Sequence, residues 1–285
     1  MSSAPIQDFL KMAGLCLPAM MMTFSINQCI EPRSAFEGSF QGTTSTGPAD
    51  QMPVVREKLR MPDALDLIAR PRMTKLLRRS QAQFPATLIL GRAGTGKTSI
   101  AASFSREFER PGWYSVESND TDWGLFSRYF AACVDCTADA VSRRASRDDV
   151  PTDNEIAQFL AQMFCLSDTG PDNLPSLIVL DDIHNLFDAP WFEAFFGLLL
   201  YSLPTTTHLL LLSRSRPPGP LWRLRSKQML NVLDEKVIAF DIAETQALFR
   251  NLGFSASDAE AAQKQAFGRV GRLVDGSSTS PLTSR

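Results

Sequence analysis

The chain has 285 residues, of which 44% are hydrophobic and 21% charged, and its 29 basic and 31 acidic side chains give a net charge of −2. This composition excludes collagen-like, coiled-coil and wholly disordered proteins, and the length fits one large domain or two small ones. The near-neutral charge excludes a generally basic nucleic-acid binder but leaves room for a local basic patch.

The N-terminal residues are expected to form a disordered tail and a linker, or to be upstream sequence read from a start codon that is set too early. Residues 12–30 carry no charge, but Pro18 and several polar residues interrupt the apolar run, and no net positive segment precedes it. That pattern does not fit an export signal or a membrane span. Residues 34–51 are rich in Ser, Thr and Gly, which is typical of a linker. We therefore expect a cytoplasmic protein without membrane contact, in which residues 1–52 lie outside the folded part.

From residue 71 onward, helix and strand patterns alternate along the chain. Amphipathic spacing predicts helices over 71–80, from Lys97 to Pro111-Gly112, and over 123–133, 152–163 and 190–201. Short, almost wholly apolar runs predict buried strands over 86–90, 113–116, 176–180 and 208–212. The polar stretch 137–150 is expected to be a surface loop, and the aromatic rings of 190–201 to pack in the core. This alternation predicts an α/β fold with three layers and a mainly parallel sheet.

The pattern changes after residue 220. Asp241 with Glu244 predicts a capped helix that Gly253 ends, and Ser257 with Glu260 predicts a second helix, which ends near residue 268. We expect residues 53–220 to form the core, 221–270 a partial helical region and 271–285 a second disordered tail.

The first site motif joins the strand at 86–90 to the helix that begins at Lys97. Residues 91–98, GRAGTGKT, fit the pattern GxxxxGK[ST] in full. Glycines allow a sharp turn and a close approach to phosphate, while backbone N–H groups and the helix N-terminus attract the anion. Lys97 is expected to reach the β- and γ-phosphates, and Thr98 to ligate Mg²⁺. The alternative is a chance match, against which the strand–loop–helix context argues.

Two further motifs follow buried strands. Asp181 and Asp182 come after the strand at 176–180, where Asp181 is expected beside Mg²⁺ and Asp182 beside the attacking water. Arg214 follows the strand at 208–212 and is placed to sense a γ-phosphate and stabilise transferred charge. An acidic pair or an arginine in a solvated turn is the alternative for each motif. His184 either orders the acidic loop or is structural.

The five cysteines are odd in number and dispersed, which does not fit a secreted disulfide framework. Cys133 and Cys136 form a CxxC at the end of the 123–133 helix, with no second pair or His cluster beside them. That context favours structural thiols over redox or metal chemistry.

These motifs, in this order and spacing, resemble the STAND class of P-loop NTPases. More closely, they resemble the nucleotide-binding module of MalT-type (LuxR-family) transcriptional activators. The resemblance covers about residues 53–270 and is carried by GRAGTGKTS at 91–99, GWYSVESNDTDWGLFSRYF at 112–130, IVLDDIH at 178–184, LLLSR at 210–214, LWRLRSKQML at 221–230 and VIAFDIAETQALF at 237–249.

This resemblance implies a switch that holds ADP in a closed monomer. Exchange for ATP, with an inducer or partner, opens the monomer for self-association, and slow hydrolysis resets it. By position, it implies Mg²⁺ ligands at Thr98 and Asp181 and catalytic roles for Lys97, Asp182 and Arg214. It also implies a nucleotide-binding segment that comprises Gly91, Arg92, Ala93, Gly94, Thr95, Gly96, Lys97, Thr98 and Ser99.

The sequence departs from the family pattern after its second C-terminal helix. The family's Gly-Trp motif and winged-helix segment are not found, and the chain reads GRVGRLVDGSSTSPLTSR from residue 268. These residues show no helix-turn-helix, zinc finger or long basic helix, so we expect no direct nucleic-acid binding by this chain. The alternatives are a P-loop kinase or another stand-alone P-loop ATPase, or a degenerate fragment that binds nucleotide weakly.

Overall fold

The computed structural model describes residues 55–63, 68–134, 150–164, 174–266, 268–269 and 273. All of them belong to one compact unit, Val55–Arg285. The expectations for residues 1–52, for the loop at 137–149, for Cys136 and for most of the tail at 271–285 lie outside the described residues. Among the described helices, none has the length and hydrophobicity needed to cross a lipid bilayer.

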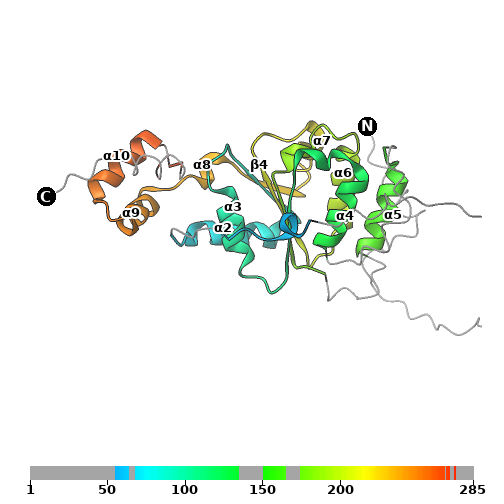
Figure 1. Ribbon diagram of the computed structural model, residues 1–285, viewed down its shortest axis with the longest axis horizontal. Helices are drawn as coiled ribbons and strands as arrows, with labels where there is room; N and C mark the ends of the chain where they lie inside the picture. The colour runs from blue at the N-terminus through cyan, green and yellow to red at the C-terminus, as the bar shows by residue number, and fades with distance from the viewer. Residues whose placement is uncertain are drawn as a thin grey trace, which may run out of the picture. The chain divides into compact units, whose positions relative to one another are not determined.

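A five-stranded parallel sheet forms the centre of the described unit, with strand order β2-β3-β4-β1-β5 (Figure 1). The strands are β1 (Ala86–Leu90), β2 (Pro111–Ser115), β3 (Leu177–Asp181), β4 (His208–Ser213) and β5 (Leu230–Leu233). The first four confirm the predicted strands to within two residues at each end. β5 pairs with β1 and was not predicted, because the pattern from residue 221 onward indicated a helical region.

Helices cover both faces of this sheet, which confirms the α/β three-layer prediction (Figure 1). On one face, Met73, Leu77 and Phe104 form a core cluster with alternate strand residues such as Ile89 and Leu210. The helical elements are η1 (Arg56–Leu59), α2 (Pro71–Gln83), α3 (Lys97–Ser105), η2 (Ser118–Thr121), α4 (Trp123–Cys133), α5 (Asp153–Phe164), η5 (Ile183–Leu186), α6 (Phe192–Ser202), α7 (Gly219–Arg223), α8 (Glu235–Ile238), α9 (Ile242–Asn251) and α10 (Ala256–Ala266).

Aromatic side chains fill the other face of the sheet. The Trp191 and Phe126 ring centroids lie 4.4 Å apart, and Phe195 meets Phe126 edge-on at 5.0 Å. Phe192, Phe195 and Phe196 are fully buried. The rings at the start of α6 are therefore core residues, as the sequence predicted.

Two predicted helix boundaries were wrong. α3 ends at Ser105, and Pro111 and Gly112 begin β2 instead of ending that helix. The Asp241–Glu244 capping box of α9 is confirmed, but α10 is capped by Ser255 and Asp258 and not by Ser257 and Glu260. Both candidate pairs share the same spacing, so the local pattern alone could not distinguish them.

Candidate functional site

The loop between β1 and α3 has a backbone that only glycine adopts without strain at two positions. Gly94 has φ 74° and Gly96 has φ 82°, both in the left-handed region. At Gly91 a Cβ atom would lie 2.8 Å from the Thr95 hydroxyl, so close packing also requires glycine there. The two glycines that the motif fixes are therefore required for different reasons: close packing at Gly91 and a left-handed backbone at Gly96.

Lys97 is the first residue of α3, and its side chain folds back over the loop. Its Nζ donates to the carbonyl oxygens of Gly91 at 2.7 Å and of Arg92 at 3.2 Å. The Thr95 hydroxyl donates to the same Arg92 carbonyl at 2.8 Å. Burial lowers the pKa of Lys97, although Asp182 and Asp181 act in the opposite direction. The ammonium group thus lies in a partly desolvated position, where its attraction for an anion is strengthened.

Thr98 and Asp181 meet directly, although 83 residues separate them: the threonine hydroxyl donates to Asp181 Oδ2 at 2.8 Å. Asp181 ends β3 and is buried, and burial raises its pKa to about 6, against the hydrogen bond from Thr98, which lowers it. Its second oxygen, Oδ1, is buried without a hydrogen-bond partner. A hydroxyl, a carboxylate and an unpartnered carboxylate oxygen together fit a hard divalent cation such as Mg²⁺.

Asp182 and Arg214 form an ion pair at the rim of the same site. Asp182 Oδ1 accepts from Arg214 Nε at 3.2 Å, and Oδ2 accepts from Nη2 at 2.8 Å. The hydrogen bond with Asp182 raises the pKa of Arg214. His184 Nδ1 lies 3.7 Å from Asp182 Oδ1, which is too long for a hydrogen bond, and burial lowers the histidine pKa.

The strand order explains why these residues converge. β4 lies between β1 and β3, so the loop, the aspartates and Arg214 all lie at the carboxyl end of the sheet, where these three strands end. Of the nine residues at 91–99, Gly91, Thr95 and Lys97 are buried, while Arg92, Ala93, Gly94 and Ser99 are exposed. The structure thus brings together Lys97, Thr98, Asp181, Asp182 and Arg214.

One residue beside this loop, Glu235, was not predicted from the sequence. Its Oε2 accepts from Arg92 Nε at 3.3 Å, while its Oε1 accepts from Arg269 Nε at 2.5 Å. Burial alone would raise the pKa of Glu235, but the hydrogen bonds from Arg92 and Arg269 outweigh it and lower that pKa. Glu235 begins the four-residue helix α8, which was not predicted, and 143 residues separate it from Arg92. No local pattern could have linked the two.

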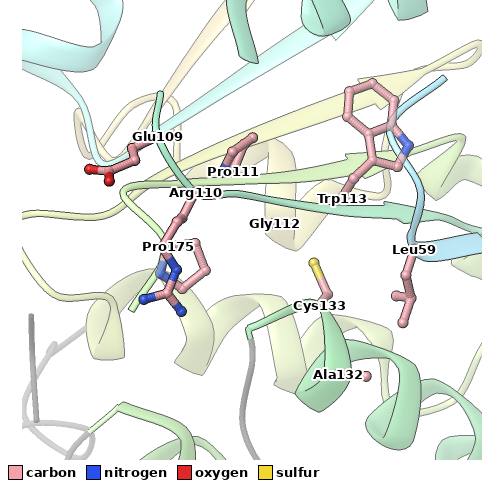
Figure 2. Close-up of a pocket in the computed structure, with 9 residues that line it drawn as sticks. All are labelled: Leu59, Glu109, Arg110, Pro111, Gly112, Trp113, Ala132, Cys133 and Pro175. Atoms are coloured by element: carbon pink, nitrogen blue, oxygen red, sulfur yellow. The ribbon is translucent and has the colours of Figure 1, made fainter. Parts of the chain in front are cut away.

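A cavity of about 380 Å³ lies at the amino-terminal ends of β2 and β3, so it is separate from the site at their carboxyl ends (Figure 2). The Cys133 thiol points toward Gly112, where a Cβ atom would lie 2.5 Å from the Cys133 carbonyl oxygen. Burial raises the Cys133 pKa, so the thiol stays neutral. This burial supports a structural role for Cys133.

A family model described as the AAA ATPase domain matches residues 70–212. The chain is also 27% identical over 197 residues to the HTH-type transcriptional regulator MalT of Vibrio cholerae, a match that covers 68% of this chain and 21% of MalT. MalT of Yersinia enterocolitica is 28% identical over 169 residues, which cover 59% of this chain and 18% of MalT. The chain therefore spans about a fifth of the length of the curated relatives that it matches.

Among solved structures, the Orc1 protein of Aeropyrum pernix, determined in complex with DNA, is 17% identical with a TM-score of 0.46, and the match covers 75% of this chain and 60% of that chain. A Walker-type ATPase of Pyrococcus abyssi is 14% identical with a TM-score of 0.44, over 76% of this chain and 68% of that chain.

Proposed function

The chain belongs to the AAA ATPase domain family, and from this membership we propose that it is an ATP-binding, slowly hydrolysing switch module of a MalT-like regulator. Nucleotide binding follows from the family, while hydrolysis and the regulatory role are the proposed steps. The observation that carries the proposal is the convergence of five side chains at the carboxyl end of the sheet: Lys97, Thr98, Asp181, Asp182 and Arg214.

Each of these side chains has a proposed part in binding and hydrolysis. Lys97 exchanges its carbonyl partners for β- and γ-phosphate oxygens, and backbone N–H groups of residues 91–99 surround the same phosphates. Thr98 and Asp181 would hold Mg²⁺, which would neutralise phosphate charge there. Asp182 accepts a proton from the water that attacks the γ-phosphorus. The bond between the γ-phosphorus and the β–γ bridging oxygen breaks, and Arg214 stabilises the transferred charge.

Nucleotide titration of the full chain tests the binding part of the proposal. Lys97→Met removes the ammonium group and keeps the length of the side chain, and we expect ATP and ADP to bind about ten- to a hundredfold more weakly. The matched control is Lys75→Met, since Lys75 is an exposed lysine of α2. Equal affinities for wild type and Lys97→Met would contradict the assignment.

The switch part of the proposal concerns association between copies. In the proposed cycle the ADP form is monomeric, and the form with a non-hydrolysable ATP analogue self-associates. Sedimentation velocity of the full chain with each nucleotide measures this directly. Identical sedimentation in both states would leave a nucleotide-binding ATPase module but would contradict the switch.

A further inference from the structure

The connection from β4 to β5 is rich in positive charge, although the net charge of the whole chain is only −2. Residues 214–233 contain no acidic side chain, and four exposed cations lie in this segment beyond Arg214. We call these four residues the basic patch: Arg216, Arg223, Arg225 and Lys227.

The cations of the basic patch have no carboxylate partners among the described residues. Within residues 55–269 as far as the structure describes them, no ion pair joins any patch residue to an acidic side chain. By contrast, Arg60 pairs with Asp63, and Arg78 pairs with Glu107. Arg214 is paired with Asp182 and is therefore not part of the patch.

Aromatic side chains contact three of the four patch residues, Arg216, Arg225 and Lys227. The Arg216 guanidinium lies 3.9 Å from the centre of the Trp222 ring, and that of Arg225 lies 5.3 Å from it. The Lys227 ammonium donates to the Tyr201 hydroxyl at 3.3 Å. Cation–π contacts of this kind restrict long side chains and leave their N–H groups available to a partner. The cations are thus partly ordered before any partner arrives.

The composition of this surface favours one kind of partner. The centres of protein–protein interfaces are rich in apolar side chains and poor in charge, whereas surfaces that bind nucleic acid are polar and positive. Of the exposed large hydrophobic residues, which are Val55, Val150, Tyr201, Ile242 and Leu252, only Tyr201 contacts the patch in the described part of the chain. We propose that the basic patch binds the phosphate backbone of a nucleic acid without reading its bases.

This proposal revises the expectation that the chain does not contact nucleic acid, which rested on its net charge and on the lack of a recognisable motif. It is independent of the proposed nucleotide switch, because none of the four patch residues lies in the nucleotide site. Three or four phosphate contacts give weak binding that depends strongly on salt.

Fluorescence anisotropy of a labelled oligothymidylate of about 20 nucleotides, titrated with the full chain, tests the proposal. The variant Arg223→Gln/Arg225→Gln/Lys227→Gln removes three charges and keeps one guanidinium on Trp222. The control Lys75→Gln/Arg79→Gln/Lys264→Gln removes three exposed charges elsewhere. We expect the patch variant to lose about tenfold or more in affinity and the control to lose little.

Salt dependence of the wild type provides a measurement that needs no variant. For a single strand, the slope of log K against log salt is about −0.7 for each phosphate contacted, so four contacts give a slope of about −3. A slope near zero, the absence of saturable binding, or equal losses in the patch and control variants would overturn the proposal. Equally tight binding of a poly-glutamate peptide would overturn it too, because the patch would then suit an acidic protein.

Discussion

Asp182 combines an uncommon backbone conformation with a bidentate partner. Its φ of 57° lies in the left-handed region, where asparagine and aspartate are tolerated better than most side chains. Both of its carboxylate oxygens accept from Arg214. The aspartate is therefore held in one orientation at the rim of the site, and one of its oxygens must part from Arg214 before it can accept a proton from water in the proposed hydrolysis.

Asp182→Asn should leave nucleotide affinity close to that of the wild type and slow hydrolysis by about 10²- to 10⁴-fold. Asparagine keeps the backbone conformation and the size of the side chain but cannot take a proton from water. Phosphate release under single-turnover conditions measures the effect. Asp188→Asn, at an exposed aspartate just after η5, is the matched control, and an unchanged rate in Asp182→Asn would remove Asp182 from the mechanism.

The raised pKa of Asp181 predicts that metal binding depends on pH. Its carboxyl has a pKa raised to about 6 by burial, so it is ionised above about pH 6 and takes up a proton as the pH falls through that value. The neutral carboxyl is a poor Mg²⁺ ligand. We expect Mg²⁺ to add thermal stabilisation to the ADP complex at about pH 8 and to lose most of that effect at about pH 5.

Thermal unfolding of the ADP complex, with and without Mg²⁺, measures the stabilisation that Mg²⁺ adds at each pH, which we call the Mg²⁺ increment. In Asp181→Asn the Mg²⁺ increment should be small at both pH values, because the ligand is neutral throughout. A wild-type increment that is the same at both pH values would contradict the assignment of Asp181 as the metal ligand.

At the scale of elements, two arginines at the start of α2 hold the start of α9. Arg70 Nη2 donates to Glu244 Oε2 at 2.9 Å, and Arg72 Nη2 donates to the same oxygen at 3.0 Å. Arg70 and Glu244 side chains are about nine-tenths buried. Burial alone would raise the pKa of Glu244, but the hydrogen bonds from Arg70 and Arg72 outweigh it and lower that pKa.

Glu244→Ala should lower the free energy of unfolding by about 3 kcal/mol, because it leaves Arg70 buried without its partner. The double variant Arg70→Met/Glu244→Ala should recover part of that loss, since it removes both charges. Urea unfolding measures both, with Glu260→Ala in α10 as an exposed control. Equal destabilisation in the single and double variants would show that packing, and not the ion pair, is responsible.

The elements that were predicted well are those whose formation depends on residues close together in the sequence. β1 and α4 match their predicted bounds because an apolar run and a 3.6-residue period are properties of neighbouring residues. β5 was missed because it has four residues, two of them only half-buried, and its place in the sheet depends on pairing with β1. The same contrast holds in the site, where the loop at 91–98 is a local motif but Glu235 comes close to it only through the fold.

At the scale of the whole molecule, Glu235 joins the loop at 91–98 to the C-terminal segment. One of its oxygens accepts from Arg92 and the other from Arg269. The same segment is held at Gly268, whose carbonyl oxygen accepts from the Phe240 N–H at 2.9 Å. Gly268 has φ 72°, and a Cβ atom there would lie 2.4 Å from the Phe240 carbonyl oxygen. The Glu235 carboxylate thus ties the loop at 91–98 to the chain beyond α10, and the close backbone contact with Phe240 holds the same segment.

Glu235→Gln should loosen this tie without unfolding the sheet. Glutamine keeps the shape of the side chain but replaces one carboxylate oxygen with an amide that cannot accept from arginine. We expect faster hydrogen exchange or tryptic cleavage near Arg269, and a loss of stability of about 1 kcal/mol. Glu260→Gln is the control, and unchanged exchange near Arg269 in Glu235→Gln would contradict the proposed tie.

The two edges of the sheet limit how copies of this chain can meet. β2 lies at one edge, where η1 packs against it, and β5 forms the other edge with only four residues. In the described part of the chain, neither edge therefore offers a long row of unpaired backbone groups to a strand from another molecule. The self-association proposed above would then run through side-chain surfaces, and such contacts can be made and broken without any loss of backbone pairing.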